Sequence, residues 1–155
     1  HSFPTHALPI SDVTRPTGEL VIVVDTSCSL DDHELSIIGH HVDDIVDAID
    51  PTGVIVIYCD HTLNGEPVHF DAGEEVKLSI HGGGGTAFNP PFNWCARNDV
   101  EPQALLYFTD GEADVGPDAW YGRDFEMPDY PVFWITNHTD PEFSGCEEFG
   151  EIVYI

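Results

Sequence analysis

Four uninterrupted apolar runs, rich in β-branched and aromatic residues, most strongly constrain how this chain folds. They are ELVIVVD at 19–25, GVIVIYC at 53–59, ALLYFT at 104–109 and PVFWIT at 131–136, and a fifth run, EIVYI, occupies 151–155. Runs without polar alternation predict strands that are buried on both faces, which is typical of parallel sheets covered by helices. With 41% hydrophobic residues among 155, the chain has enough apolar side chains for one domain with a real core.

Two helices are expected between these strands. From Leu35 to Ile49, apolar residues recur at three- and four-residue spacing and give one apolar stripe. Ser29 precedes two acidic residues and is the expected N-cap of this helix. A shorter helix is expected from Pro90 to Arg97, entered through Asn89 and Pro90.

Strands alternating with helices predict an α/β fold with a doubly wound, mainly parallel, Rossmann-like sheet. The Asn64-Gly65 turn signal predicts that residues 67–70 return as one antiparallel edge strand. Residues 111–131 are interrupted by Gly and Pro and are expected to form a loop. Residues 1–18 are expected to be an arm or linker, and residues 19–155 the folded domain.

The charge balance limits the classes of partner. The chain has 29 Asp and Glu against 4 Lys and Arg, a formal net charge of -25. No basic patch can form, which excludes nucleic-acid binding through phosphate neutralisation and disfavours anionic membranes. The longest apolar run, around Leu20 to Val24, is too short to span a bilayer. Metal cations and basic or metal-bridged protein partners remain open.

The cysteines and the first residues suggest where such a chain functions. The four cysteines form no CxxC pair, so reduced thiols in a cytoplasmic protein are expected; they are Cys28, Cys59, Cys95 and Cys146. The first residues show no signal peptide. Because the sequence does not begin with Met, we expect it to be part of a longer protein.

Three polar segments stand out, and each follows a predicted strand. They are Asp25-Thr26-Ser27-Cys28-Ser29, Gly82-Gly83-Gly84-Gly85-Thr86 and Thr109-Asp110-Gly111. Ligands of open α/β sheets gather at the carboxyl ends of the strands, where the strand order reverses, so these segments can converge there. The candidate ligands are all hard oxygen donors, which suit Mg²⁺, Mn²⁺ or Ca²⁺ better than zinc; they are Asp25, Ser27, Ser29, Thr86 and Asp110.

These segments resemble a von Willebrand factor A (VWA) domain with a metal-ion-dependent adhesion site. Such a site is defined by D-x-S-x-S, a distant Thr and a distant Asp, which appear here in order. A narrower resemblance is to the VWA-like domain at the C-terminus of predicted bacterial and phage metallopeptidases. The segments that carry it are GGGGT followed by Ala87-Phe88, then FTDG, PVFWIT and the closing FG-EIVYI. The resemblance covers roughly Glu19 to the end.

The resemblance implies a dication held by those five residues, with a partner's Asp or Glu completing its coordination. In such sites the serines and often the threonine bind the metal directly, and the aspartates act largely through water. It also implies a metallopeptidase-like domain in the full-length protein and an AAA+ ATPase as a further partner. Two positions depart from the family pattern: Cys28 replaces a usual Gly, and Ala87 a common Asp.

Other functions remain open for the same residues. A Mg²⁺-dependent hydrolase would use the same cluster, but no general base with a matching acid or nucleophile stands beside it, so we expect a non-catalytic domain. A VWA-type scaffold with an empty site is the third alternative. Residues from Asp60 to Asp71 half resemble an EF-hand loop, although Pro67 and flanking strands argue against one. The acidity predicts a basic partner surface, bound more weakly in salt and in chelator.

Overall fold

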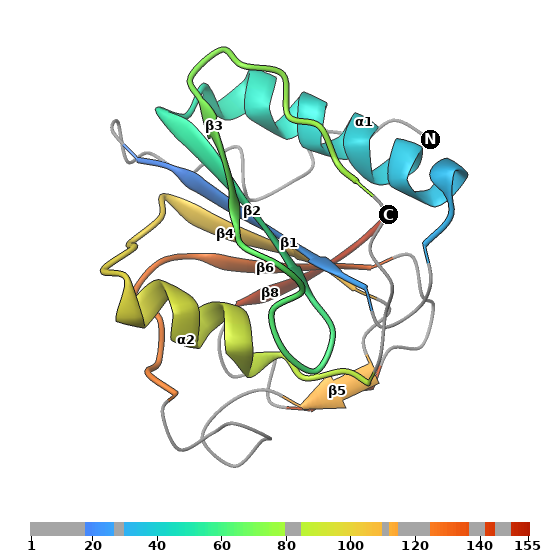
Figure 1. Cartoon of the computed structure of the whole chain (residues 1–155), viewed down its shortest axis with the longest axis vertical. Coiled ribbons are helices and arrows are strands. Elements are labelled where there is room, and N and C mark those ends of the chain that lie inside the picture. Colours follow the sequence, from blue (N-terminus) through green and yellow to red (C-terminus); the bar gives the residue numbers. More distant parts are fainter. Residues whose placement is uncertain are drawn as a thin grey trace.

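A six-stranded sheet forms the centre of the protein in the computed structural model (Figure 1). The structure describes residues 18–26, 30–79, 85–109, 112–114, 125–136, 142–144 and 150–155, with the backbone alone for 112–114 and 142–144. The sheet strands are β1 (Leu20–Asp25), β2 (Gly53–Cys59), β3 (Val68–Asp71), β4 (Ala104–Phe108), β6 (Val132–Thr136) and β8 (Glu151–Tyr154). β5 (Glu112–Asp114) and β7 (Glu142–Ser144) pair in parallel as a separate two-stranded sheet.

The strand order is β3-β2-β1-β4-β6-β8, and every neighbouring pair is parallel except β2 and β3. From β1 the chain first builds outward through β2 and β3, then crosses back to add β4 on the other side. The boundary between β1 and β4 is therefore the point where the strand order reverses. This topology confirms the predicted α/β fold, including the antiparallel edge strand.

Helix α1 (Asp32–Ile49) begins at a different residue from the one the sequence suggested. Its N-cap is Asp31, whose Oδ1 accepts the Glu34 N–H at 2.8 Å while Glu34 Oε1 accepts the Asp31 N–H at 3.5 Å. The prediction of Ser29 as the cap is wrong, because this reciprocal capping box satisfies two N-terminal donors. The helix ends at Asp50, in the left-handed conformation, with its N–H bonded to Val46.

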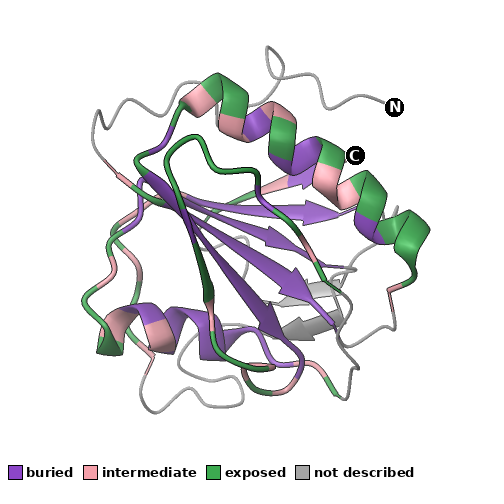
Figure 2. Ribbon diagram, turned by 45° about the horizontal axis from the view of Figure 1, so that its top comes forward, coloured by how far each residue is buried: buried purple, intermediate pink, exposed green. Residues whose placement is uncertain are grey.

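Helix α2 (Asn89–Arg97) carries two prolines in its first turn, where the missing N–H groups would have no intrahelical acceptor anyway. This matches the predicted short helix. The two helices cover opposite faces of the sheet (Figures 1 and 2), as the doubly wound class requires. In the part of the chain that the structure describes, neither helix has the length and apolarity needed to cross a membrane.

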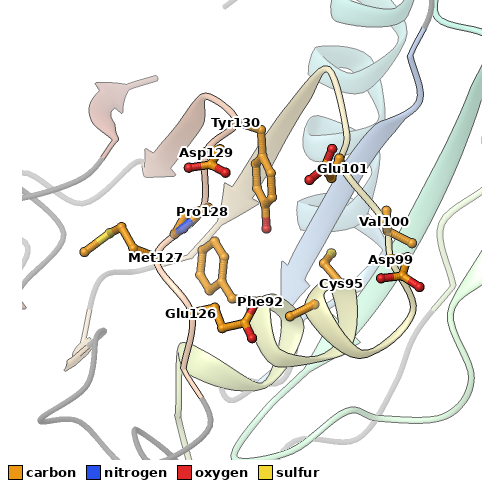
Figure 3. Close-up of a pocket in the computed structure, with 11 residues that line it drawn as sticks. Phe92, Cys95, Asp99, Val100, Glu101, Glu126, Met127, Pro128, Asp129 and Tyr130 are labelled. Carbon is orange, nitrogen blue, oxygen red and sulfur yellow. The ribbon is translucent and has the colours of Figure 1, made fainter.

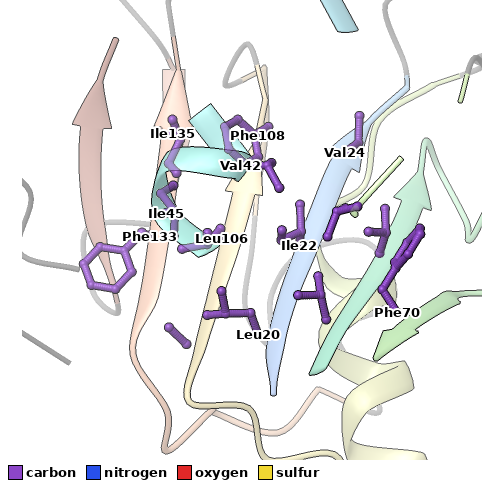
Figure 4. Close-up of a cluster of buried hydrophobic side chains, with 14 of the residues drawn as sticks. Leu20, Ile22, Val24, Val42, Ile45, Phe70, Leu106, Phe108, Phe133 and Ile135 are labelled. Carbon is purple, nitrogen blue, oxygen red and sulfur yellow. The ribbon is translucent and has the colours of Figure 1, made fainter. Parts of the chain in front are cut away.

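Strand side chains alternate between two separate cores. Leu20, Ile22 and Val24 of β1 face α1, where they pack with Val42 and Ile45 of that helix (Figure 4). The intervening β1 residues belong to the core beneath α2, and β2, β4 and β6 alternate in the same way. The apolar runs lack polar alternation because both faces of these strands are buried (Figure 2).

Aromatic rings dominate the core on the α2 face. Trp134 of β6 is stacked on Tyr107 of β4 with ring centroids 4.9 Å apart. Phe88 and Phe92 lie 5.3 and 5.7 Å from the same tryptophan ring. These four rings pack with the aliphatic side chains of the sheet between α2 and the strands, and they are the largest side chains of this core.

Residues 111–131, expected to be a loop, include the short strand β5. Its partner β7 lies in a segment that no pattern marked as a strand. Both strands have only three residues, which is too short for a hydrophobic period to be recognised. The pairing between them joins segments far apart in the sequence, and the local pattern carries no information about it.

Gly150 allows β8 to enter the sheet, and we expect Gly150→Ala to destabilise the protein. Its φ is +93°, and an added Cβ would lie 2.8 Å from the Val132 carbonyl oxygen and 2.9 Å from Trp134 Nε1. The substitution should lower the free energy of unfolding by about 2 kcal/mol, measured by urea denaturation. Gly39→Ala is the matched control, because nothing lies within 4 Å of a Cβ there. Equal stability of the two variants would contradict this role.

Candidate functional site

The carboxyl ends of β1 and β4 are joined by a short hydrogen bond between side chains. Asp25 is the last residue of β1 and is 6% exposed. Thr109, directly after β4, donates its hydroxyl proton to Asp25 Oδ2 at 2.6 Å. A hydroxyl–carboxylate bond of this length is charge-assisted and strong. It fixes the Asp25 carboxylate at the point where the strand order reverses.

Two further segments meet the same edge of the sheet. The Thr26 N–H donates to the Cys59 carbonyl at 2.8 Å, which carries the β1–β2 pairing one residue beyond the strands. The Ala87 N–H donates to the Asp60 carbonyl at 2.9 Å. Thr86 is the neighbour of Ala87 and is half-buried, so its segment is anchored beside the end of β2.

The structure thus brings two of the five predicted ligand residues, Asp25 and Thr86, to segments at one edge of the sheet. Ser27, Ser29 and Asp110 lie outside the described residues. Among the residues that are described, no three His, Cys, Asp or Glu side chains form a group that could hold a metal ion. The assignment of these five residues to a metal stays a prediction.

Two polar residues at this edge were not among the predicted ligands. Thr109 ends the ALLYFT run, and its position next to Asp110 was the only signal for it. Asp60 follows β2 and is 8% exposed. Its Oδ1 accepts the Thr62 N–H at 3.1 Å and lies 3.1 Å from His61 Nδ1. The signal available for Asp60 was its position directly after β2, a buried strand that pairs with β1.

The resemblance to an EF-hand loop does not survive the strand register. Asp71 pairs with Gly53 at the amino end of β2, whereas Asp60 follows Cys59 at its carboxyl end. A strand of seven residues separates these carboxylates by about 20 Å. One calcium ion therefore cannot be bound by both ends of this segment.

The cysteine at this edge is a neutral thiol. Burial is the main cause that raises the pKa of Cys59 to about 12; a hydrogen bond from Tyr107 lowers it, and the nearby carboxylates of Asp25 and Asp60 raise it. Its Sγ donates to the carbonyl oxygens of Asp60 and Ala87 at 3.4 and 3.5 Å. A protonated thiol is a poor metal ligand and a poor nucleophile. Cys59 therefore packs the site and does not supply its chemistry.

The remaining donors at this edge fit a hard cation. The Asp25 carboxylate and the Thr86 hydroxyl are oxygen donors of the kind that Mg²⁺ prefers. The Thr26 hydroxyl is also buried, at 2% exposure, and has no hydrogen-bond partner in the described part of the chain. A buried hydroxyl without a partner costs free energy unless another group engages it. The edge therefore has the composition of an oxygen-ligand site.

Fold and site together define a class: a doubly wound α/β domain whose candidate site lies at the strand-order reversal between β1 and β4. A family model described as VWA-like domain (DUF2201) matches residues 20–155, and the chain belongs to this family. Membership suggests a protein-interaction or scaffold role. Comparison with curated proteins and with solved structures finds no match.

Proposed function

We propose that this domain is a divalent-metal-dependent protein-interaction module. Asp25, Ser27, Ser29, Thr86 and Asp110 hold Mg²⁺, or Mn²⁺ or Ca²⁺ in its place, and a partner protein supplies an Asp or Glu to the metal. The observation that carries the proposal is the 2.6 Å bond between Thr109 and the buried Asp25 carboxylate. This bond joins the ends of β1 and β4, from which two of the three ligand segments continue.

The donor set explains why a partner carboxylate is needed. Three of the five residues are neutral hydroxyls, so the protein contributes only two negative charges. The bound metal would supply an electrophilic site for one more anionic oxygen. Fixing Asp25 in advance lowers the entropy lost when the cation binds, because its carboxylate is already oriented.

The larger context of this module is part of the same proposal. Resemblance to the C-terminal domain of predicted metallopeptidases supports a full-length protein with a metallopeptidase-like domain. The association of similar VWA proteins with AAA+ ATPases supports such an ATPase as a partner. A cytoplasmic setting is part of the proposal, and the free thiols of Cys59 and Cys95 in the described part support it.

Calorimetric titration of Mg²⁺ and Mn²⁺ into the chain tests the metal site. We expect saturable binding to the wild type and binding weaker by about 100-fold in Asp110→Ala. Asp47→Ala, an exposed acid on α1, is the matched control and should bind like the wild type. An absence of binding to the wild type would contradict the proposal in favour of an empty scaffold. Metal-dependent turnover of phosphoesters or peptides would favour the hydrolase alternative.

A further inference from the structure

A second candidate site lies at the amino ends of the sheet strands, opposite the carboxyl ends that carry the first site. A cavity of about 390 Å³ opens between the C-terminal end of α2, the segment leading to β4 and the segment leading to β6 (Figure 3). These segments precede their strands, so the cavity is at the amino ends, away from Asp25 and Thr109. Its volume is within the range of small-ligand pockets. Asp25 and Thr86, the two predicted metal ligands that the structure describes, do not line it.

The floor of this cavity is apolar and aromatic. Phe92 and Cys95 of α2 are 2% and 1% exposed, and they point toward Tyr130 (Figure 3). The Tyr130 hydroxyl hydrogen-bonds with the Cys95 thiol, and burial raises the pKa of both groups, that of Cys95 to about 12. The floor is therefore neutral at physiological pH, and the half-buried ring of Tyr130 is the aromatic surface available for packing.

The described part of the rim of this cavity carries only negative charge. Asp99, Glu101, Glu126 and Asp129 are exposed around it, and among the residues that the structure describes no Lys, Arg or His lines it. An anionic group entering the cavity would be repelled by four carboxylates. A purely apolar group would use the floor and leave the rim without a counterpart. A cation at the end of an apolar stem pairs with the carboxylates of the rim while its stem packs against the floor.

We propose that this cavity binds an arginine side chain from a basic segment of a partner protein. The guanidinium fits the rim because it is planar, always charged and able to pair with two carboxylates at once. Its aliphatic stem and flat face pack against the half-buried ring of Tyr130. The cavity volume fits one long side chain with a short stretch of backbone, which is smaller than a folded partner's whole interface.

Charge alone does not single out this cavity, and a second cleft shows why. A cleft of about 390 Å³ between α1 and the segment after β3 also carries carboxylates, including Asp43, Asp47 and Glu75. Among the described residues, no aromatic side chain lines it. It offers the electrostatic attraction without the packing surface. It therefore supplies the control for any effect of charge in general.

A short peptide with one arginine, and the same peptide with neutral citrulline in its place, test the proposal. We expect the arginine peptide to shift the NMR amide signals of α2 and of residues 125–130, and the citrulline peptide to bind about tenfold more weakly. The double variant Glu126→Gln/Asp129→Asn should bind the arginine peptide about fivefold more weakly. Both acids are exposed, so this double variant should fold.

The double variant Glu74→Gln/Glu75→Gln removes the same charge from the second cleft and should change binding less than twofold, because salt screens distant charges. Equal binding of the arginine and citrulline peptides would overturn the proposal in favour of an apolar occupant. If the two double variants weakened peptide binding equally, the effect would come from net charge alone, and the proposal would be overturned as well. Binding should persist in EDTA, which separates this site from the proposed metal site.

Discussion

Replacing Trp134 with alanine is expected to lower the free energy of unfolding by about 4 kcal/mol. The side chain is fully buried and contacts three other rings, of which Tyr107 is stacked on it. Removing the indole leaves a void between α2 and the sheet, and Phe88 and Phe92 lose a packing partner. Domains of this size are stable by about 5–15 kcal/mol, so the loss is a large share of the total.

Urea denaturation followed by circular dichroism measures this effect. Met127→Ala is the control, because that side chain is 54% exposed and its loss should change stability by less than about 0.5 kcal/mol. Trp134→Phe keeps a ring in the core and should recover much of the lost stability. If Trp134→Ala cost less than about 1 kcal/mol, the aromatic cluster would not be the main support of the α2 face.

The strands could be predicted because burial on both faces leaves a clear pattern. Residues 53–59 were expected as a strand and form β2 with the same limits. The N-terminus of α1 was less well defined, because Ser29, Asp31 and Asp32 are all acceptable caps. The choice of Asp31 depends on the reciprocal bond from Glu34, and the sequence signature of a capping box usually has Ser or Thr in that position.

The site was only partly predictable, for a different reason. The sequence indicates which residues follow strands, and Asp25 was found in this way. It does not indicate side-chain pairing between strands, and the bond from Thr109 to Asp25 spans 84 positions. Asp60 was missed because an acid that follows a strand is not by itself a signal of a site, and its position beside the end of β1 depends on the sheet order.

Mg²⁺ at about 100 times its dissociation constant is expected to raise the free energy of unfolding of the wild type by about 2.7 kcal/mol. The proposed site predicts this stabilisation, because a folded chain that brings the five ligands together binds the cation and the unfolded chain does not. In Asp25→Asn the stabilisation by Mg²⁺ should largely disappear, because the amide lacks the charge that attracts the cation. The amide keeps the shape of the side chain and still accepts the hydrogen bond from the Thr109 hydroxyl. Urea denaturation with and without Mg²⁺ measures both values.

Two controls separate a specific site from general screening of the acidic surface. The net charge of -25 means that any salt reduces self-repulsion, so the ionic strength must be matched with a monovalent salt. Asp60→Asn removes a buried charge at the same edge, but Asp60 is outside the predicted ligand set. The Mg²⁺ effect should therefore persist in Asp60→Asn. If the two asparagine variants lost it equally, the cation would be attracted by the local charge at this edge and not held by Asp25.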